Sequence, residues 1–219
     1  LIKKIRSSFG SFLRIGEKNM YIGDVKSKTF IDANASSNTF VAVAAQPTTT
    51  FTLAKTSFGS NTARKITATT SGSGDGSKTV TIVGTDQSGA AATEVIALPG
   101  SASTTAGTTT AFLTITSATV SAQPAANVSL GMTADVFGSV FDGRTRVRQA
   151  NVASGGAIGS VEIRDGSISG TSLLTLRTQA TEGDISTVNI PQDGVLYKDG
   201  AFVSFSEVNC NSVTIYFDG

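Results

Sequence analysis

The sequence predicts an all-β fold: two antiparallel β-sandwich domains, Ig-like or jelly-roll-like, preceded by an extended N-terminal arm. Short apolar runs with a period of two follow one another from residue 38 to the end of the 219-residue chain. Gly, Pro and Asp-Gly steps separate these runs, and no segment after residue 38 has the period of a helix. Short strands with regular turn signals are typical of sandwiches.

Residues 1–37 form the predicted arm, which carries a local excess of positive charge. Its basic residues are Lys3, Lys4, Arg6, Arg14, Lys18, Lys26 and Lys28, against Glu17 and Asp24. Its apolar residues Ile2, Ile5, Phe9, Phe12 and Leu13 follow a spacing of three and four, as on one face of a helix. Two interpretations stay open: a flexible or extended arm, or an amphipathic segment that orders only against a partner surface.

The first sandwich domain is expected over residues 38–133. Its predicted strands cover residues 39–45, 49–55, 64–70, 78–84, 92–98, 111–122 and 126–132. In the run 78–84, Val80 and Ile82 share one face and Thr79 and Thr81 the other, which is the alternation of a half-buried strand. The glycine-rich loop 71–77 leads into this strand rather than into a helix, so it is read as a hairpin loop and not as a phosphate-binding loop.

The second sandwich domain is expected over residues 134–219. Its predicted strands cover residues 144–151, 159–165, 172–178, 185–190, 194–197, 201–205 and 212–217. The turns between them are Ser154-Gly155-Gly156, Asp165-Gly166, Asp193-Gly194 and Asp199-Gly200. Asp-Gly steps suit tight turns, because glycine adopts positive φ without steric cost. The two sets of strands differ in the lengths and spacing of their strands, which predicts two unlike domains rather than a repeat.

The composition argues against catalysis. The chain has no His, no Trp and a single Cys, so neither a His-based nucleophile system nor a common zinc site can be assembled. Cys210 is expected to be a small buried residue. The aspartates neighbour glycines in turns and form no calcium-binding cluster. We therefore expect a protein that is not an enzyme, with no catalytic, cofactor-binding or metal-binding residues.

Three arginines with a period of two, Arg144, Arg146 and Arg148, form the most distinctive basic feature after the arm. On a strand they would project from one face about 6.5–7 Å apart and would repel one another unless anions faced them. Three interpretations stay open: pairing with acidic residues on a neighbouring strand, a row of salt bridges between subunits, or contact with nucleic acid. With a formal net charge of +1, no specific nucleic-acid partner is expected.

Two long stretches carry recognisable motifs that cover over half of the chain. Residues 64–131 contain the hairpin TIVGTDQSGAAATE (81–94), a Ser/Thr/Gly loop and the segments FLTITSATVS (112–121) and NVSLG (127–131). Residues 159–219 contain VEIRDG (161–166), IPQDGVLYKDG (190–200) and SVTIYFDG (212–219). Each stretch resembles a module that recurs in virion proteins of tailed bacteriophages. The resemblance implies a virion structural protein.

Among virion roles, the leading expectation is a capsid decoration (cement) protein on the outer capsid surface. Its partners would be the major capsid protein and copies of itself, for example in a trimer. The predicted docking residues are Ile2, Lys3, Lys4, Ile5, Arg6, Phe9 and Phe12 of the arm, together with Arg144, Arg146 and Arg148.

Two other roles stay open. One is a neck, tail or fibre-associated protein, whose partner could be a host glycan; the other is a surface adhesin or carbohydrate-binding module. No run approaches the ~18 apolar residues of a membrane span, so no membrane partner is expected.

Overall fold

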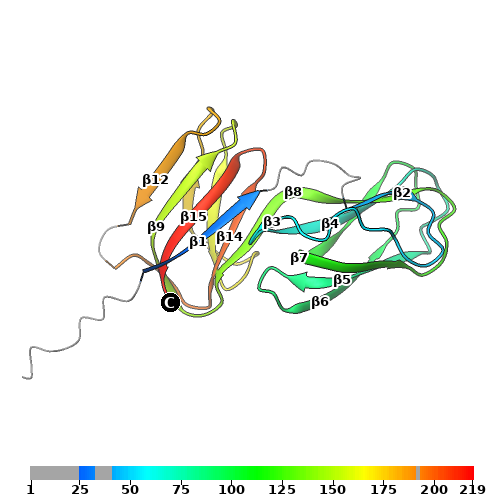
Figure 1. The fold of residues 1–219 in the computed structure, drawn as a ribbon, viewed down its shortest axis with the longest axis horizontal. Coiled ribbons are helices and arrows are strands. Elements are labelled where there is room, and N and C mark those ends of the chain that lie inside the picture. Colours follow the sequence, from blue (N-terminus) through cyan, green and yellow to red (C-terminus); the bar gives the residue numbers. More distant parts are fainter. Residues whose placement is uncertain (1–24, 33–40, 191–192) are drawn as a thin grey trace, which may run out of the picture.

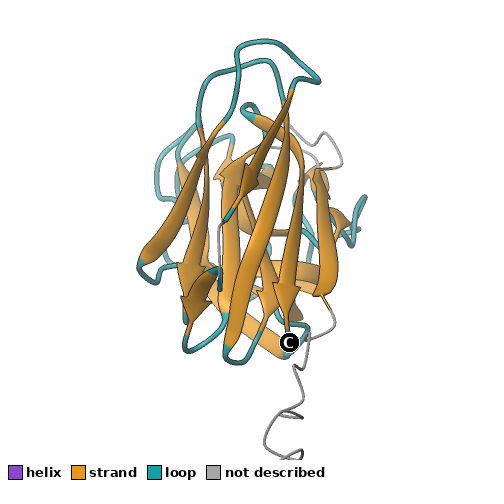
Figure 2. Cartoon of the chain, turned by 90° about the vertical axis from the view of Figure 1, so that its left-hand side faces the viewer, coloured by secondary structure: helices purple, strands orange, loops and turns teal. Residues whose placement is uncertain are grey.

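The structure, a computed structural model, describes residues 25–32, 41–190 and 193–219. Figure 2 shows these residues as strands and loops, which confirms the predicted all-β fold with antiparallel sheets. Among them there is no helix that is long and apolar enough to cross a membrane.

Two sheets contain all the strands. Sheet A has the order β12-β9-β15-β1-β3, and β13 also pairs with β9. Its strands are β1 (Val25–Asp32), β3 (Gly59–Ser60), β9 (Thr145–Ser154), β12 (Ile185–Asn189), β13 (Val195–Tyr197) and β15 (Cys210–Asp218). Sheet B has the order β11-β10-β14-β8-β4-β7-β5-β6, and β2 also pairs with β8. Its strands are β2 (Ala42–Ala45), β4 (Ala63–Thr70), β5 (Thr79–Asp86), β6 (Ala91–Ala97), β7 (Thr105–Val120), β8 (Val128–Phe141), β10 (Ser160–Asp165), β11 (Ser172–Arg177) and β14 (Ala201–Ser206).

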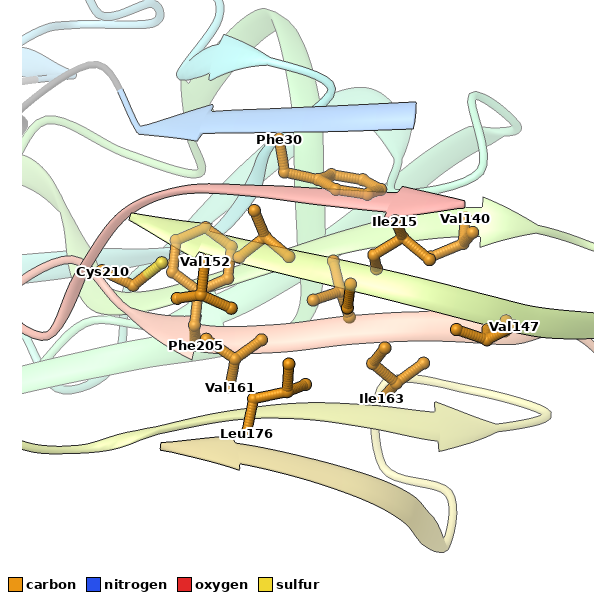
Figure 3. Close-up of a cluster of buried hydrophobic side chains, with 14 of the residues drawn as sticks. Phe30, Val140, Val147, Val152, Val161, Ile163, Leu176, Phe205, Cys210 and Ile215 are labelled. Atoms are coloured by element: carbon orange, nitrogen blue, oxygen red, sulfur yellow. The ribbon is translucent and has the colours of Figure 1, made fainter. Parts of the chain in front are cut away.

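The strands form two lobes (Figure 1). In lobe 2, sheet A packs against β10, β11, β14 and the second part of β8. Alternate residues of these strands build its core, in which Phe30, Ile163 and Ile215 are fully buried. Figure 3 shows the Phe30 ring of β1 and the Cys210 thiol within this core. Cys210 is buried, as predicted, and its Sγ donates to the carbonyl of Ser212 (3.3 Å).

Lobe 1 consists of β2, β4, β5, β6, β7 and the first part of β8, around a second core. The long strand β7 belongs to both sides of this core, since its first half pairs with β4 and its second half with β5. A bulge at residues 108–110 interrupts the pairing of β7 with β4, because Lys65 pairs with Ala111 while Thr67 pairs with Gly107. Bulges bend strands and increase their twist, so this one lets β7 wrap around the core. The predicted strand 49–55 is not a strand; within it, Thr50 forms an isolated bridge to Thr119 of β7.

The two lobes are joined by β8, which runs through both. The domain boundary expected near residue 134 falls inside this strand, at a bulge: Arg64 pairs with Val136, but Ile66 already pairs with Met132. The side chain of Arg64 is fully buried, donates from Nη1 to the Thr133 carbonyl (2.9 Å), and has Nη2 2.9 Å from Oε2 of Glu207. The Glu207 amide donates to the carbonyl of Ala134 (3.0 Å). The interruption in the sequence pattern is therefore a bulge held by Arg64 and Glu207 within one continuous strand.

The expected arm also needs correction, because its part Val25–Asp32 is strand β1 of sheet A. This strand pairs with β15 from Val25 opposite Asp218 to Ile31 opposite Ser212. Its placement depends on Phe30, which lies over Gly138 of β8: a Cβ at Gly138 would come within 2.2 Å of the Phe30 ring. The free energy gained by burying this aromatic side chain outweighs the tendency of the charged Lys26 and Lys28, on either side of Ser27, to keep the segment in water.

Asp75, in the loop before β5, joins two loops of lobe 1 through a buried carboxylate. It accepts hydrogen bonds from the amides of Ala125 (2.7 Å) and Ala126 (3.2 Å) and from Lys78 Nζ (2.8 Å). Burial opposes ionisation, but the Lys78 ammonium and the two amides outweigh it and hold the pKa of Asp75 below its ordinary value. A lowered pKa contributes stability above the ordinary value, and this contribution is lost as the pH falls through the folded-state pKa.

We expect Asp75→Asn to lower the free energy of unfolding at pH 7 by about 1–3 kcal/mol, because charge-assisted hydrogen bonds are lost at a buried site. The difference from the original chain should shrink as the pH falls below about 4, where Asp75 of the unfolded chain becomes protonated, and it should vanish below the lowered folded-state pKa. Urea unfolding at pH 7 and at pH 3 measures both effects. Asp184→Asn, in an exposed loop, is the control and should change little. A loss at Asp75 that is equal at both pH values would contradict this account.

Candidate docking surface

The outer face of sheet A is a broad surface built from four strands, β12, β9, β15 and β1. Every second side chain of these strands points into the core, for example Val152 of β9 and Val213 of β15, so the others point outward. The pairing registers align the outward residues in rows across the strands. The rows read Asn189, Gln149, Tyr216 and Ser27; then Thr187, Asn151, Thr214 and Thr29; then Ile185, Ala153, Ser212 and Ile31.

These three rows contain amides, hydroxyls and small or apolar side chains, and no charged residue. Gln149 Nε2 donates to Asn151 Oδ1 (3.1 Å), and the hydroxyls of Thr29 and Thr214 are 3.0 Å apart. The third row ends in two exposed apolar side chains, Ile185 (73% exposed) and Ile31 (47%). Covering such a face with a partner would desolvate no formal charge, so its cost is low compared with that of a charged surface.

The arginine motif lies at one end of this face, but its members do not act alike. Arg148 forms an ion pair with Asp218 of β15, with Nη2 at 2.5 Å and Nε at 2.7 Å from Oδ2. Arg146 donates from Nη1 to the carbonyl of Asp193 (3.2 Å), and Arg144 is exposed just before β9 begins. The first interpretation, pairing with an acidic residue on a neighbouring strand, therefore describes Arg148.

A bulge explains why the period of two does not hold through this motif. Val147 and Ala150 both point into the core, which leaves Arg148 and Gln149 together between them. The register with β15 shifts at the same place, between Tyr216 and Phe217. Two residues of β9 here oppose one of β15, so Arg148 does not continue a simple row from Arg146.

A shallow depression of about 290 Å³ lies beside Arg144 and Arg146 and is also lined by Leu196 and Asp218. The register places Leu196, Arg146, Asp218 and Val25 in one row across the sheet. Val25 is the first described residue of the chain and lies at the border of the outer face. The predicted docking residues Ile2, Lys3, Lys4, Ile5, Arg6, Phe9 and Phe12 lie outside the described residues.

Sequence reasoning missed the surface itself, although part of its signal is present. The alternation of Val213, Ile215 and Phe217 with Thr214 and Tyr216 predicts one outward face of β15. That this face extends over β1, β9 and β12 depends on pairings between residues up to 193 positions apart, such as Val25 with Asp218.

Another depression, of about 380 Å³, lies on the outer side of sheet B in lobe 2 and is lined by Glu162, Arg164 and Asp135 among others. Within the described ranges, no group of His, Cys, Asp and Glu side chains could hold a metal ion.

Comparison with known proteins gives no match: no family model, no curated protein and no solved structure is similar to this chain.

Proposed function

We propose that this chain is a non-enzymatic structural subunit of a tailed-bacteriophage particle, and within the particle a capsid decoration protein that bridges and stabilises major-capsid subunits. The observation that carries the proposal is the outer face of sheet A. It is broad, free of charge in its three central rows and bordered by the exposed side chains of Val25, Ile31 and Ile185. Such a face can pack against a protein shell without desolvating a formal charge.

The architecture of the body supports the same role. Sheet B passes through both lobes, and the buried Arg64 is paired with Glu207 at their junction, so a load on one lobe is transmitted to the other through paired strands. The basic segment 1–24 precedes Val25 in the sequence, and we propose that it adds a second contact with the shell. Two linked contacts bind far more tightly than either alone, because the second forms at high effective concentration.

The proposal is tested by the copy number of the protein per particle, from quantitative mass spectrometry of purified virions with the major capsid protein as the standard. A decoration protein should be present at parity with the major capsid protein or at a simple fraction of it. A count of about a dozen or fewer, as expected for a component on a symmetry axis of the neck or tail, would exclude decoration of the shell.

The role of the outer face can be tested separately with Thr187→Lys, which places a charge in its central row at an exposed position. If this face docks on the shell, the unpaired charge must be desolvated, and we expect at least a tenfold loss of affinity, about 1.4 kcal/mol. Binding is measured by co-sedimentation with shells that lack the protein. Ala102→Lys adds the same charge to an exposed loop of lobe 1 and should bind as the original chain does. Equal binding by both variants would exclude the face as the docking surface.

A further inference from the structure

Strand β6 is the last strand of sheet B and leaves one backbone edge without a paired strand. Figure 1 shows it at the margin of lobe 1, beyond β5. It pairs with β5 over seven residues, from Thr79 opposite Ala97 to Thr85 opposite Ala91, and this register has no shift. The edge is therefore straight and unbroken for the length of the strand.

The backbone groups on the free edge can be assigned from the pairing with β5. Asp86 donates to the carbonyl of Ala90 (2.8 Å), and Leu98 donates to the carbonyl of Lys78 (2.9 Å). In an antiparallel pair the direction of these groups alternates along the strand, so the even-numbered residues of β6 bond to β5. The N–H and C=O groups that point away from β5 then belong to Ala91, Thr93, Val95 and Ala97.

The side chains of β6 do not protect this edge. The four residues with outward backbone groups are all exposed, uncharged and small or β-branched, and Val95 is 57% exposed. The only charged residue, Glu94, turns its carboxylate to the bulge of β7, where it accepts from the amides of Thr109 (2.7 Å) and Thr110 (2.8 Å). Burial opposes ionisation of Glu94, but these two amides outweigh it and hold the pKa of its carboxyl below the ordinary value.

Two other outer strands, β1 and β11, carry the usual safeguards against pairing with another chain. Strand β1, paired on its outer side with β3 only at Ile31 and Asp32, has Lys26 and Lys28. Strand β11 ends in Arg177 and has a register shift against β10. Among strands at the ends of the two sheets, β6 is the longest whose register is unbroken. A straight, uncharged edge is a template for an added strand.

We propose that β6 is a self-association edge, which pairs antiparallel with β6 of a second copy of this chain about a two-fold axis. A second copy fits because the pairing covers both open edges at once, and because no like charges meet among the outward residues. With the axis at Glu94, Ala91 lies opposite Ala97 of the copy and Thr93 opposite Val95. These four hydrogen-bonded pairs would supply about eight main-chain hydrogen bonds. The two Glu94 carboxylates meet near the axis but are held back by their own Thr109 and Thr110 amides.

This inference concerns lobe 1 and goes beyond the proposed function, on which it does not depend. It is tested by sedimentation equilibrium of the full chain over a range of concentrations. We expect a reversible dimer, with twice the chain mass of 22.3 kDa. Val95→Lys should raise the dissociation constant at least tenfold. The matched control is Val208→Lys, since Val208 is also 57% exposed but lies in the loop between β14 and β15 of lobe 2.

A second variant tests the hydrogen-bonding edge itself. Thr93→Pro removes an N–H group that points away from β5, so the pairing within the chain keeps its hydrogen bonds while the dimer loses two. Thermal unfolding checks that each variant is folded. The register is tested by mixing Thr93→Cys and Val95→Cys chains with a short thiol crosslinker, which should join the mixture much faster than either chain alone. A monomer at all concentrations, a trimer, or a dimer unaffected by Val95→Lys and Thr93→Pro would overturn the proposal.

Discussion

Replacing Phe30 with alanine is expected to lower the free energy of unfolding by about 3–5 kcal/mol, the range for large aromatic truncations in a core. Phe30 is fully buried between the sheets of lobe 2, and its ring fills the space over Gly138 that any other residue would occupy with a Cβ. The truncation leaves a cavity that the backbone of Gly138 cannot fill.

Guanidinium-induced unfolding measures this loss, and the neighbouring residue provides the control. Ile31 belongs to the same strand but is 47% exposed, so Ile31→Ala should cost far less, within about 1 kcal/mol. If the two variants lose the same stability, then the position of β1 in sheet A does not depend on the Phe30 side chain. A further check is Gly138→Ala, which should destabilise the chain through contact with the Phe30 ring and do so less in the Phe30→Ala background.

Removing Arg64 should have a comparable effect at the junction of the lobes, about 3–5 kcal/mol for Arg64→Ala. The reason is that the substitution leaves the Glu207 carboxylate without its guanidinium partner. Glu207, whose side chain is only 11% exposed, would lose a guanidinium at 2.9 Å, and the bulged Thr133 carbonyl would lose its donor. Breaking a buried ion pair costs more than the pair contributes, because an uncompensated charge is left in a poorly solvated site.

A double-mutant cycle separates this penalty from the loss of packing. Arg64→Met keeps much of the side-chain volume, and the combination with Glu207→Gln removes the stranded charge. We expect the double variant to be more stable than the sum of the two single losses predicts, with a coupling energy of about 1–3 kcal/mol from denaturant unfolding. Strict additivity would mean that the ion pair contributes nothing specific to the junction.

Local pattern predicted the regular hairpins well and failed where strands bend or pair over long distances. In β5 and β15 the alternation of apolar and polar residues matches the buried and outward faces. In β8, Thr133, Ala134 and Asp135 break the alternation, and the sequence pattern therefore indicates a domain boundary there. Because β8 pairs with β4 on one side and β14 on the other, these residues instead form a bulge within one strand. Strand β1 was predicted as part of the arm because Lys26 and Lys28 give it a basic composition. Its pairing partner, β15, begins only at Cys210, so no local pattern indicates that residues 25–32 form a strand.

The candidate surface was predictable only in part for the same reason. The arginines were found because they are close together in the sequence, but the bulge at Arg148 and Gln149 depends on the register with β15. The rows through Asn151, Thr214 and Thr187 combine residues from separate segments, and no short motif marks them. Local patterns encode which side chains of a strand point into the core. Burial of the shared core then decides which strands become neighbours.

The pairing of β1 with β15 has a consequence for the order in which a ribosome delivers this chain. Val25–Asp32 is synthesised before every other described strand and Cys210–Asp218 after all of them, so β1 cannot reach its place until β15 has emerged. Lobe 1, whose strands all lie between Ala42 and Phe141, can assemble in the interval. Closing such a long loop is slow, because its entropic cost precedes any gain from contacts. Nascent chains halted before Cys210 should therefore carry a folded lobe 1 and an exposed Phe30, the form in which a chaperone would meet them.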